Sequence, residues 1–174
     1  MPRNDCRLVV TPFSETEPMI SLTRILVPTD FSEPSEIAVN YAKALAENFD
    51  AALHILHVIE ERELVYGKLS SSSFSSLNSI IEEIEKNVRE RLDNVLTQSE
   101  REQYRAELVL LTGTPFVEII RYARARSIDL IVLGTHGRGP IAHMLMGSVA
   151  EKVVRKAPCP VLTVRHPEHE FVMP

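Results

Sequence analysis

The run Arg24-Ile-Leu-Val-Pro-Thr29-Asp30-Phe-Ser-Glu-Pro34 contains both the end of a strand and the start of a helix. Its first half is short, apolar and partly β-branched, which is typical of a strand that is buried on both faces. Its second half combines an acidic residue, a serine and a proline, and this combination marks a helix start with proline in the first turn. We therefore predict a strand that leads directly into a helix.

The same alternation of strand and helix patterns continues to residue 164. The first helix has an apolar stripe at helical spacing, at Ile37, Tyr41, Leu45 and Phe49. Four more strands are predicted over residues 51–59, 105–111, 129–133 and 160–164. A helix is predicted over residues 77–98, another begins at Thr114-Pro115, and the last begins at Ser148 with a capping box to Glu151. The pattern is typical of parallel βαβ units, so the predicted fold class is α/β, a single doubly wound domain with helices on both faces of the sheet.

The chain of 174 residues is long enough for one domain with short appendages. We predict an N-terminal extension over residues 1–22, a domain over residues 23–165 and a C-terminal tail over residues 166–174. Residues 60–76 are serine-rich and too polar for a core element. They are interpreted as a disordered loop, with a lid or a partner-binding loop as the alternative.

Composition and charge exclude several classes of protein. The net charge is −5, from 19 basic and 24 acidic residues, which argues against a nucleic-acid partner. The longest apolar runs have the length of a strand, so no membrane association is expected, and the first residues lack the pattern of a secretory signal. We therefore expect a cytoplasmic protein. Two basic clusters, at residues 121–126 and 152–156, are interpreted as solvated helix faces.

Glycines are concentrated between the fourth strand and the last helix. Four of the six glycines lie there, at Gly134, Gly137, Gly139 and Gly147. Glycine lets backbone N–H groups approach a ligand closely, and the helix that begins at Ser148 adds the positive end of its dipole. The pattern indicates an anion site, most naturally for phosphates. A glycine-rich turn with no ligand is the alternative.

Asp30 is expected to lie beside this glycine cluster. In a doubly wound sheet of order 3-2-1-4-5, the first and fourth strands are neighbours, and ligands bind beyond their carboxyl ends. A carboxylate at that point suits donor groups of a nucleoside. Taken alone, Asp30 would more simply be a partner for a helix N-cap. The two sites together favour a nucleotide.

The glycine spacing resembles that of a known family. Gly134-x-x-Gly137, nine residues and then Gly147-Ser148 is similar to the signature of the ATP-binding universal stress proteins. Pro28-Thr29-Asp30 and His57-Val58 resemble further landmarks of the family, and the likeness covers residues 23–165. The resemblance implies a Rossmann-like, five-stranded parallel sheet of order 3-2-1-4-5.

The resemblance also implies the roles of individual residues in an ATP pocket. Asp30 and the backbone of Val58 would meet the adenine, with Pro28 and Thr29 lining the wall, and Gly134 would approach the ribose. The residues expected around the phosphates are His136, Gly137, Arg138, Gly147, Ser148 and Val149. Mg²⁺ or Mn²⁺ would accompany the phosphates.

The fifth strand is expected at an edge of the sheet, over Pro160–Val164. An unpaired apolar edge invites pairing with another chain, and the resemblance implies a homodimer through this strand. Protection of the edge by residues 165–174 is the alternative.

No catalytic residue and no separate metal site are assigned. Phosphoryl transfer needs a group that orients water, and beyond His136, His143 and Arg138 the sequence offers no clear candidate for it. The function that the resemblance implies is an ATP-binding module for signalling in the stress response. The alternatives are an ATP hydrolase of low turnover and a nucleotide-free, chaperone-like dimer.

Overall fold

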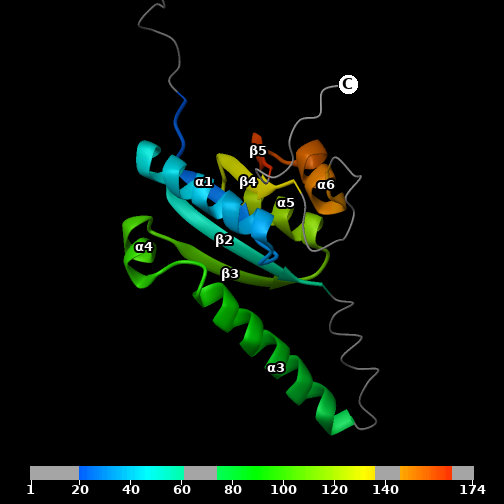
Figure 1. The fold of residues 1–174 in the computed structure, drawn as a ribbon. Helices are drawn as coiled ribbons and strands as arrows, with labels where there is room; N and C mark the ends of the chain where they lie inside the picture. The colour runs from blue at the N-terminus through cyan, green and yellow to red at the C-terminus, as the bar shows by residue number, and fades with distance from the viewer. Residues whose placement is uncertain (1–19, 61–73, 136–145, 166–174) are drawn as a thin grey trace, which may run out of the picture.

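A computed structural model describes residues 20–60, 74–135 and 146–165. Five parallel strands form one sheet in the order β3-β2-β1-β4-β5, which confirms the predicted fold class and strand order. The strands are β1 Arg24–Pro28, β2 Ala52–Ile59, β3 Glu107–Thr112, β4 Leu130–Gly134 and β5 Val161–Val164. The helices are α1 Glu33–Phe49, α3 Phe74–Asp93, α4 Gln98–Gln103, α5 Pro115–Ala125 and α6 Ser148–Lys156 (Figure 1). None of the described helices is both long and apolar enough to cross a membrane.

The sheet separates two hydrophobic cores. Because successive strand residues point to opposite faces, Ile25, Val27 and Ile55 pack on the side of α1, whereas Leu26 and Leu56 pack on the side of α5 and α6. These strand side chains are at most 1% exposed, so both faces of the central strands are covered by helices. This double cover explains why the strands are nearly continuous apolar runs.

The buried face of α1 differs from the predicted stripe. Small residues face the sheet, namely Ala38, Val39, Ala42 and Ala46. Ile37 and Leu45 are only half-buried against the core, while Tyr41 is 55% exposed and Phe49 is 41% exposed. Both faces have helical spacing, and the small side chains are the ones that let the helix lie close to the strands. Tyr41 and Phe49 of the predicted stripe therefore lie outside the core.

The helix predicted over residues 77–98 is present as α3, but its predicted end is wrong, because the helix stops before residue 98 and a second helix starts there. α3 ends at Asp93, and α4 begins at Gln98 behind a capping box. The Thr97 hydroxyl accepts from the Glu100 N–H at 3.3 Å, and the Thr97 N–H donates to Glu100 Oε2 at 2.8 Å. These reciprocal bonds satisfy the backbone donors at a helix start, so they fix a new helix at this point.

Two smaller expectations are corrected. The predicted capping box at Ser148 is absent, because the N-cap of α6 is Gly147 and it has no side chain to accept a hydrogen bond. α3 begins at Phe74, inside the segment over residues 60–76 that was interpreted as a loop. Residues 61–73 of that segment lie outside the described part of the chain, as do residues 1–19 and 166–174.

Candidate functional site

The sheet divides between β1 and β4 at its carboxyl end. β1 pairs with β4 only at Ile25–Leu130 and Leu26–Ile131. On the outer sides, β1 pairs with β2 as far as Pro28–Leu56, and β4 pairs with β5 as far as Gly134–Val164. The strand order reverses between β1 and β4, so this is the point where a doubly wound sheet opens a crevice for a ligand.

A tight turn that contains Asp30 follows β1. The Thr29 N–H donates to Leu56 O at 2.8 Å, which continues the ladder by one bond beyond the strand. Asp30 Oδ1 accepts from the Ser32 N–H at 3.1 Å and from the Ser32 hydroxyl at 2.5 Å. Ser32 is the N-cap of α1. Asp30 is therefore a partner of a helix N-cap, which was the simpler interpretation of this residue from the sequence. The turn also fixes the carboxyl group at the edge of the crevice.

Phe31 holds this turn in an unusual conformation. Its φ is 60°, in the left-handed region that an aromatic residue rarely occupies. The ring stacks on His57 with centroids 4.4 Å apart, and the Arg91 guanidinium lies 4.4 Å from the Phe31 centroid. His57 in turn donates through Nδ1 to Thr29 O at 2.7 Å. The stack of Arg91, Phe31 and His57 therefore fixes the backbone on both sides of Asp30.

Sequence reasoning missed two members of this stack. Phe31 carries a weak signal, since a large aromatic residue between Asp30 and a helix N-cap is unusual for a turn. Arg91 carries none, because it comes from α3, and only the packing of α3 beside β3 brings it to the turn (Figure 1).

β2 extends past β1, and Val58 lies in the extension. Residues of a parallel strand point their N–H and C=O groups alternately to its two neighbours. Leu56 O points to β1, where it accepts from Thr29, and Ile59 O points to β3, where it accepts from Gly113. Val58 therefore points its backbone N–H and C=O to the β1 side, beyond the last β1 pair at Pro28–Leu56. This backbone faces the space beyond the carboxyl end of β1.

The opposite wall begins with Gly134, where there is no room for a side chain. A Cβ at Gly134 would lie 2.8 Å from Pro34 O and 2.9 Å from Pro34 C, in the first turn of α1. This contact gives Gly134 a reason to be glycine that needs no ligand.

Gly147 ties the start of α6 to the sheet. Its N–H donates to Thr135 O at 2.7 Å, and the Thr135 N–H donates to Val164 O at 2.9 Å. The first hydrogen bond within the helix runs from the Glu151 N–H to Gly147 O. The N–H groups of Ser148 and Val149 precede that bond, so they are available at the positive end of the helix dipole.

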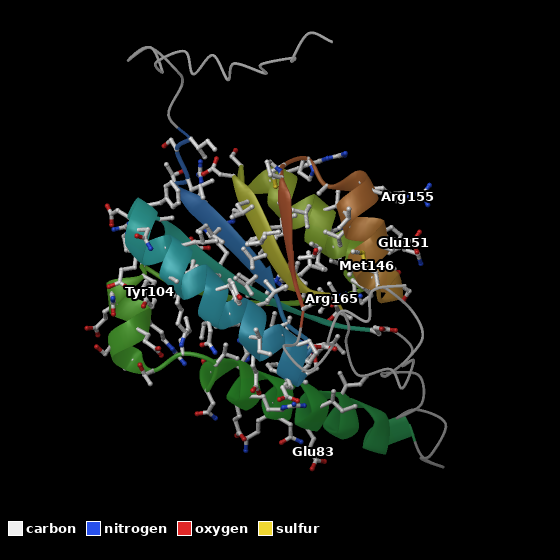
Figure 2. The ribbon with its side chains drawn as sticks, turned by 45° about the horizontal axis from the view of Figure 1, so that its top comes forward. Glu83, Tyr104, Met146, Glu151, Arg155 and Arg165 are labelled. Carbon is white, nitrogen blue, oxygen red and sulfur yellow. The ribbon has the colours of Figure 1, made fainter. Side chains whose placement is uncertain are left out.

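The predicted site residues therefore form two groups at the carboxyl end of the sheet. Pro28, Thr29, Asp30 and Val58 lie on the side of β1 and β2. Gly134, Gly147, Ser148 and Val149 lie at the end of β4 and the start of α6. Met146, directly before this helix start, and Arg165, directly after β5, mark the same region in Figure 2. The predicted phosphate residues His136, Gly137 and Arg138 lie outside the described residues.

A second polar cluster lies on the α5 side of the sheet. His54 Nδ1 is 2.8 Å from the Tyr122 hydroxyl, and that hydroxyl is 3.4 Å from Glu107 Oε2. Burial lowers the pKa of His54 below its ordinary value, against the raising effect of the Glu107 charge. Burial, reinforced by Glu107, raises the pKa of Tyr122 to about 12. The neutral ring of His54 is thus a structural group.

The described residues contain no other candidate for chemistry. No group of three His, Cys, Asp or Glu side chains among them could hold a metal ion. Burial raises the pKa of the Cys159 thiol, so the reactive thiolate form is disfavoured there. His54 and His57 lie on opposite faces of β2.

Comparison with known proteins places the chain among named relatives. A family model described as the universal stress protein family matches residues 21–165. Universal stress protein MJ0577 of Methanocaldococcus jannaschii is 33% identical over 152 residues, covering 82% of this chain and 94% of that protein. Universal stress protein YxiE of Bacillus subtilis is 32% identical over 145 residues, covering 82% of this chain and 98% of that protein.

Solved structures of universal stress proteins are also similar to this chain. The structure of MJ0577 has a TM-score of 0.72 at 30% identity, covering 86% of this chain and 99% of that one. A universal stress protein in complex with cAMP has a TM-score of 0.54 at 24% identity, covering 84% of this chain and 98% of that one, which shows a shared fold.

Proposed function

The chain belongs to the universal stress protein family, and on that premise we propose that it binds ATP and acts as a nucleotide-dependent module of the stress response. The observation that carries the proposal is the division of the sheet between β1 and β4, with the Asp30 turn on one side and the Gly147 helix start on the other. A nucleotide has a base and a phosphate group at opposite ends, which matches the chemistry of the two sides.

The adenine end is proposed to contact Asp30 and the backbone of Val58. The Val58 N–H and C=O present a donor and an acceptor side by side, and the edge of adenine has the same two functions in complementary order. Pro28 and Thr29 would line the adjacent wall. The stack on Phe31 supports this assignment, because it holds the Asp30 backbone in place before any ligand arrives.

The phosphate end is proposed to contact Gly147, Ser148 and Val149, with His136, Gly137 and Arg138 completing the site. Backbone N–H groups and the dipole at the start of α6 favour negative charge. Gly134 would border the ribose through its backbone, since Pro34 occupies the space on its Cβ side. Mg²⁺ or Mn²⁺, if it accompanies the ATP, would neutralise phosphate charge.

Binding is favoured over turnover. The described site supplies backbone N–H groups and a carboxyl group whose Oδ1 is already engaged in a turn. Hydrolysis additionally needs a group that orients the attacking water. We therefore propose that the protein is a nucleotide sensor. ATP as its ligand also fits the expected cytoplasmic location.

A homodimer through β5 is part of the proposal. β5 lies at the end of the strand order, and Leu162 on it is 38% exposed. Lys43 of α1 pairs with Glu100 of α4, on the side of the helix away from β5. Tyr41 lies on the opposite flank of α1, so it extends the apolar edge of β5. A second copy would cover both side chains and pair the strand edge.

Calorimetric titration of nucleotide-stripped protein with ATP and Mg²⁺ tests the binding. We expect about one ATP per chain with a Kd in the micromolar range, or about −8 kcal/mol. Inorganic triphosphate, titrated in the same way, should bind much more weakly, because it lacks the adenine. No heat at several temperatures would refute ATP binding, and equal affinity for both ligands would refute the adenine contacts.

A further inference from the structure

The two basic clusters of the sequence converge on one groove. α5 and α6 pack against each other, and between them lies an open groove, here called the α5–α6 groove. Its lining comes from α5 except for Lys156 of α6: the apolar side chains of Phe116, Val117 and Ile120, here called the floor, and the basic side chains of Arg121, Arg124 and Lys156, here called the rim. In the sequence these basic residues belong to two separate clusters, and the structure brings Arg121, Arg124 and Lys156 together around an apolar surface.

The floor of the groove is partly open to water and partly covered by lysine side chains. Val117 is 43% exposed. The ammonium groups of Lys152 and Lys156 lie 4.9 Å and 5.4 Å from the centroid of the Phe116 ring. Cations placed over an aromatic ring in this way lie directly beside apolar surface.

Most of the positive charge around the groove is uncompensated. Arg121 pairs with Glu118. Within the described residues, Arg124, Lys152 and Lys156 form no ion pair, and Figure 2 shows Glu151 and Arg155 paired on the outer side of α6. Three free cations on a chain with a net charge of −5 create a local positive potential. The groove therefore suits an acidic segment that carries a bulky apolar side chain.

The chain itself contains such a segment directly after β5. Residues 166–174 read His-Pro-Glu-His-Glu-Phe-Val-Met-Pro, so Glu168 and Glu170 precede Phe171. We propose that this segment occupies the α5–α6 groove of its own chain, with the two carboxylates against the rim and Phe171 on the floor.

The connection is long enough. Val164 is linked through Thr135 to Gly147, so the segment leaves the sheet beside the start of α6. The whole of α6 is about 14 Å long, at about 1.5 Å per residue. Residues 166–171, which end at Phe171, span up to about 20 Å when extended.

Attachment to the same chain makes a weak contact sufficient. A short tether gives an effective concentration on the order of 1 mM. A contact with a Kd of about 0.1 mM between separate molecules would then fill the groove about nine-tenths of the time.

The test uses the full chain and methyl NMR. In the variant Glu168→Lys, Glu170→Lys, Phe171→Ala, the methyl resonances of Val117 and Ile120 should move, while those of the buried Ile25 should not. The matched control Glu82→Lys, Glu83→Lys changes the charge equally on the exposed face of α3 and should leave all of them in place.

A synthetic peptide of residues 165–174, added to the tail variant, should restore the wild-type resonances. It should bind the wild-type chain about tenfold more weakly, because the attached segment competes. Unmoved Val117 and Ile120 methyls, or equal peptide affinity for both chains, would overturn the proposal. Shifts that grow with protein concentration would place another chain's segment in the groove and overturn it too. No nucleotide is present, so the outcome is independent of the proposed function.

Discussion

Replacing Gly134 with alanine separates two reasons for a glycine at the end of β4. The residue was predicted to leave room for a ribose, whereas the structure shows it against the first turn of α1. The three atoms nearest to an added Cβ all belong to Pro34, at 2.8, 2.9 and 3.0 Å, and two of them are backbone atoms. Backbone atoms at a helix start cannot rotate away, so the whole turn would have to move.

The expected cost follows from this geometry. Overpacking a well-filled contact destabilises a protein by about 1–3 kcal/mol. The gain from a less flexible unfolded chain offsets about 0.4–1 kcal/mol of this, because the φ of Gly134 is outside the left-handed region. We expect Gly134→Ala to lower the free energy of unfolding by about 1–2 kcal/mol, or Tm by about 2–8 °C.

The assay is thermal and urea unfolding of the ligand-free protein, with Gly147→Ala as the matched control. Gly147 has φ −67° and ψ 153°, which alanine adopts without strain. Loss of a preferred N-cap residue should cost less than about 1 kcal/mol there. If Gly134→Ala unfolds within a few tenths of a kcal/mol of the wild type, the contact with Pro34 does not restrict the site and the packing argument is wrong.

Four further results are expected. Asp30→Asn keeps an acceptor for the turn but removes the charge, so calorimetry should show weaker ATP binding with inorganic phosphate binding unchanged; equal loss of both would place Asp30 away from the nucleoside. Arg91→Ala removes a cation–π contact worth about 0.5–1 kcal/mol, so ATP affinity should fall about two- to fivefold, whereas the exposed neighbour Arg89→Ala should have no effect. Burial holds the pKa of His54 below 6.5, so as the pH falls the unfolded chain protonates His54 before the folded chain does. The free energy of unfolding should therefore decrease below about pH 6.5, by at most about 1.4 kcal/mol per pH unit. His54→Gln should flatten that slope in urea titrations, and an unchanged slope would contradict the assignment. Leu162→Glu should give a monomer in sedimentation experiments if β5 forms the dimer, and a persisting dimer would assign the interface to another surface.

Local patterns were sufficient for the fold class, whereas the strand order was implied by the resemblance to the family. The apolar runs, the proline and capping signals and the glycine spacing are all contained within short windows, and alternating strands and helices indicate parallel βαβ units. The same patterns placed Asp30 and Gly147 at the carboxyl end of the sheet before any coordinates. The break between α3 and α4 was also local, since Thr97 and Glu100 carry a capping box that the longer apolar stripe concealed.

Other features depend on residues that are distant in the sequence. The buried face of α1 is the one whose small side chains let the helix approach the strands closely. Gly134 must be glycine because it contacts the start of α1, about 100 residues earlier in the sequence. Arg91 reaches Phe31 only because α3 packs beside β3. The α5–α6 groove exists only because two basic helices meet. The sequence alone determined which elements form, because propensity and hydrophobic period are local; the tertiary structure decided which side chains meet, because contacts depend on how those elements pack.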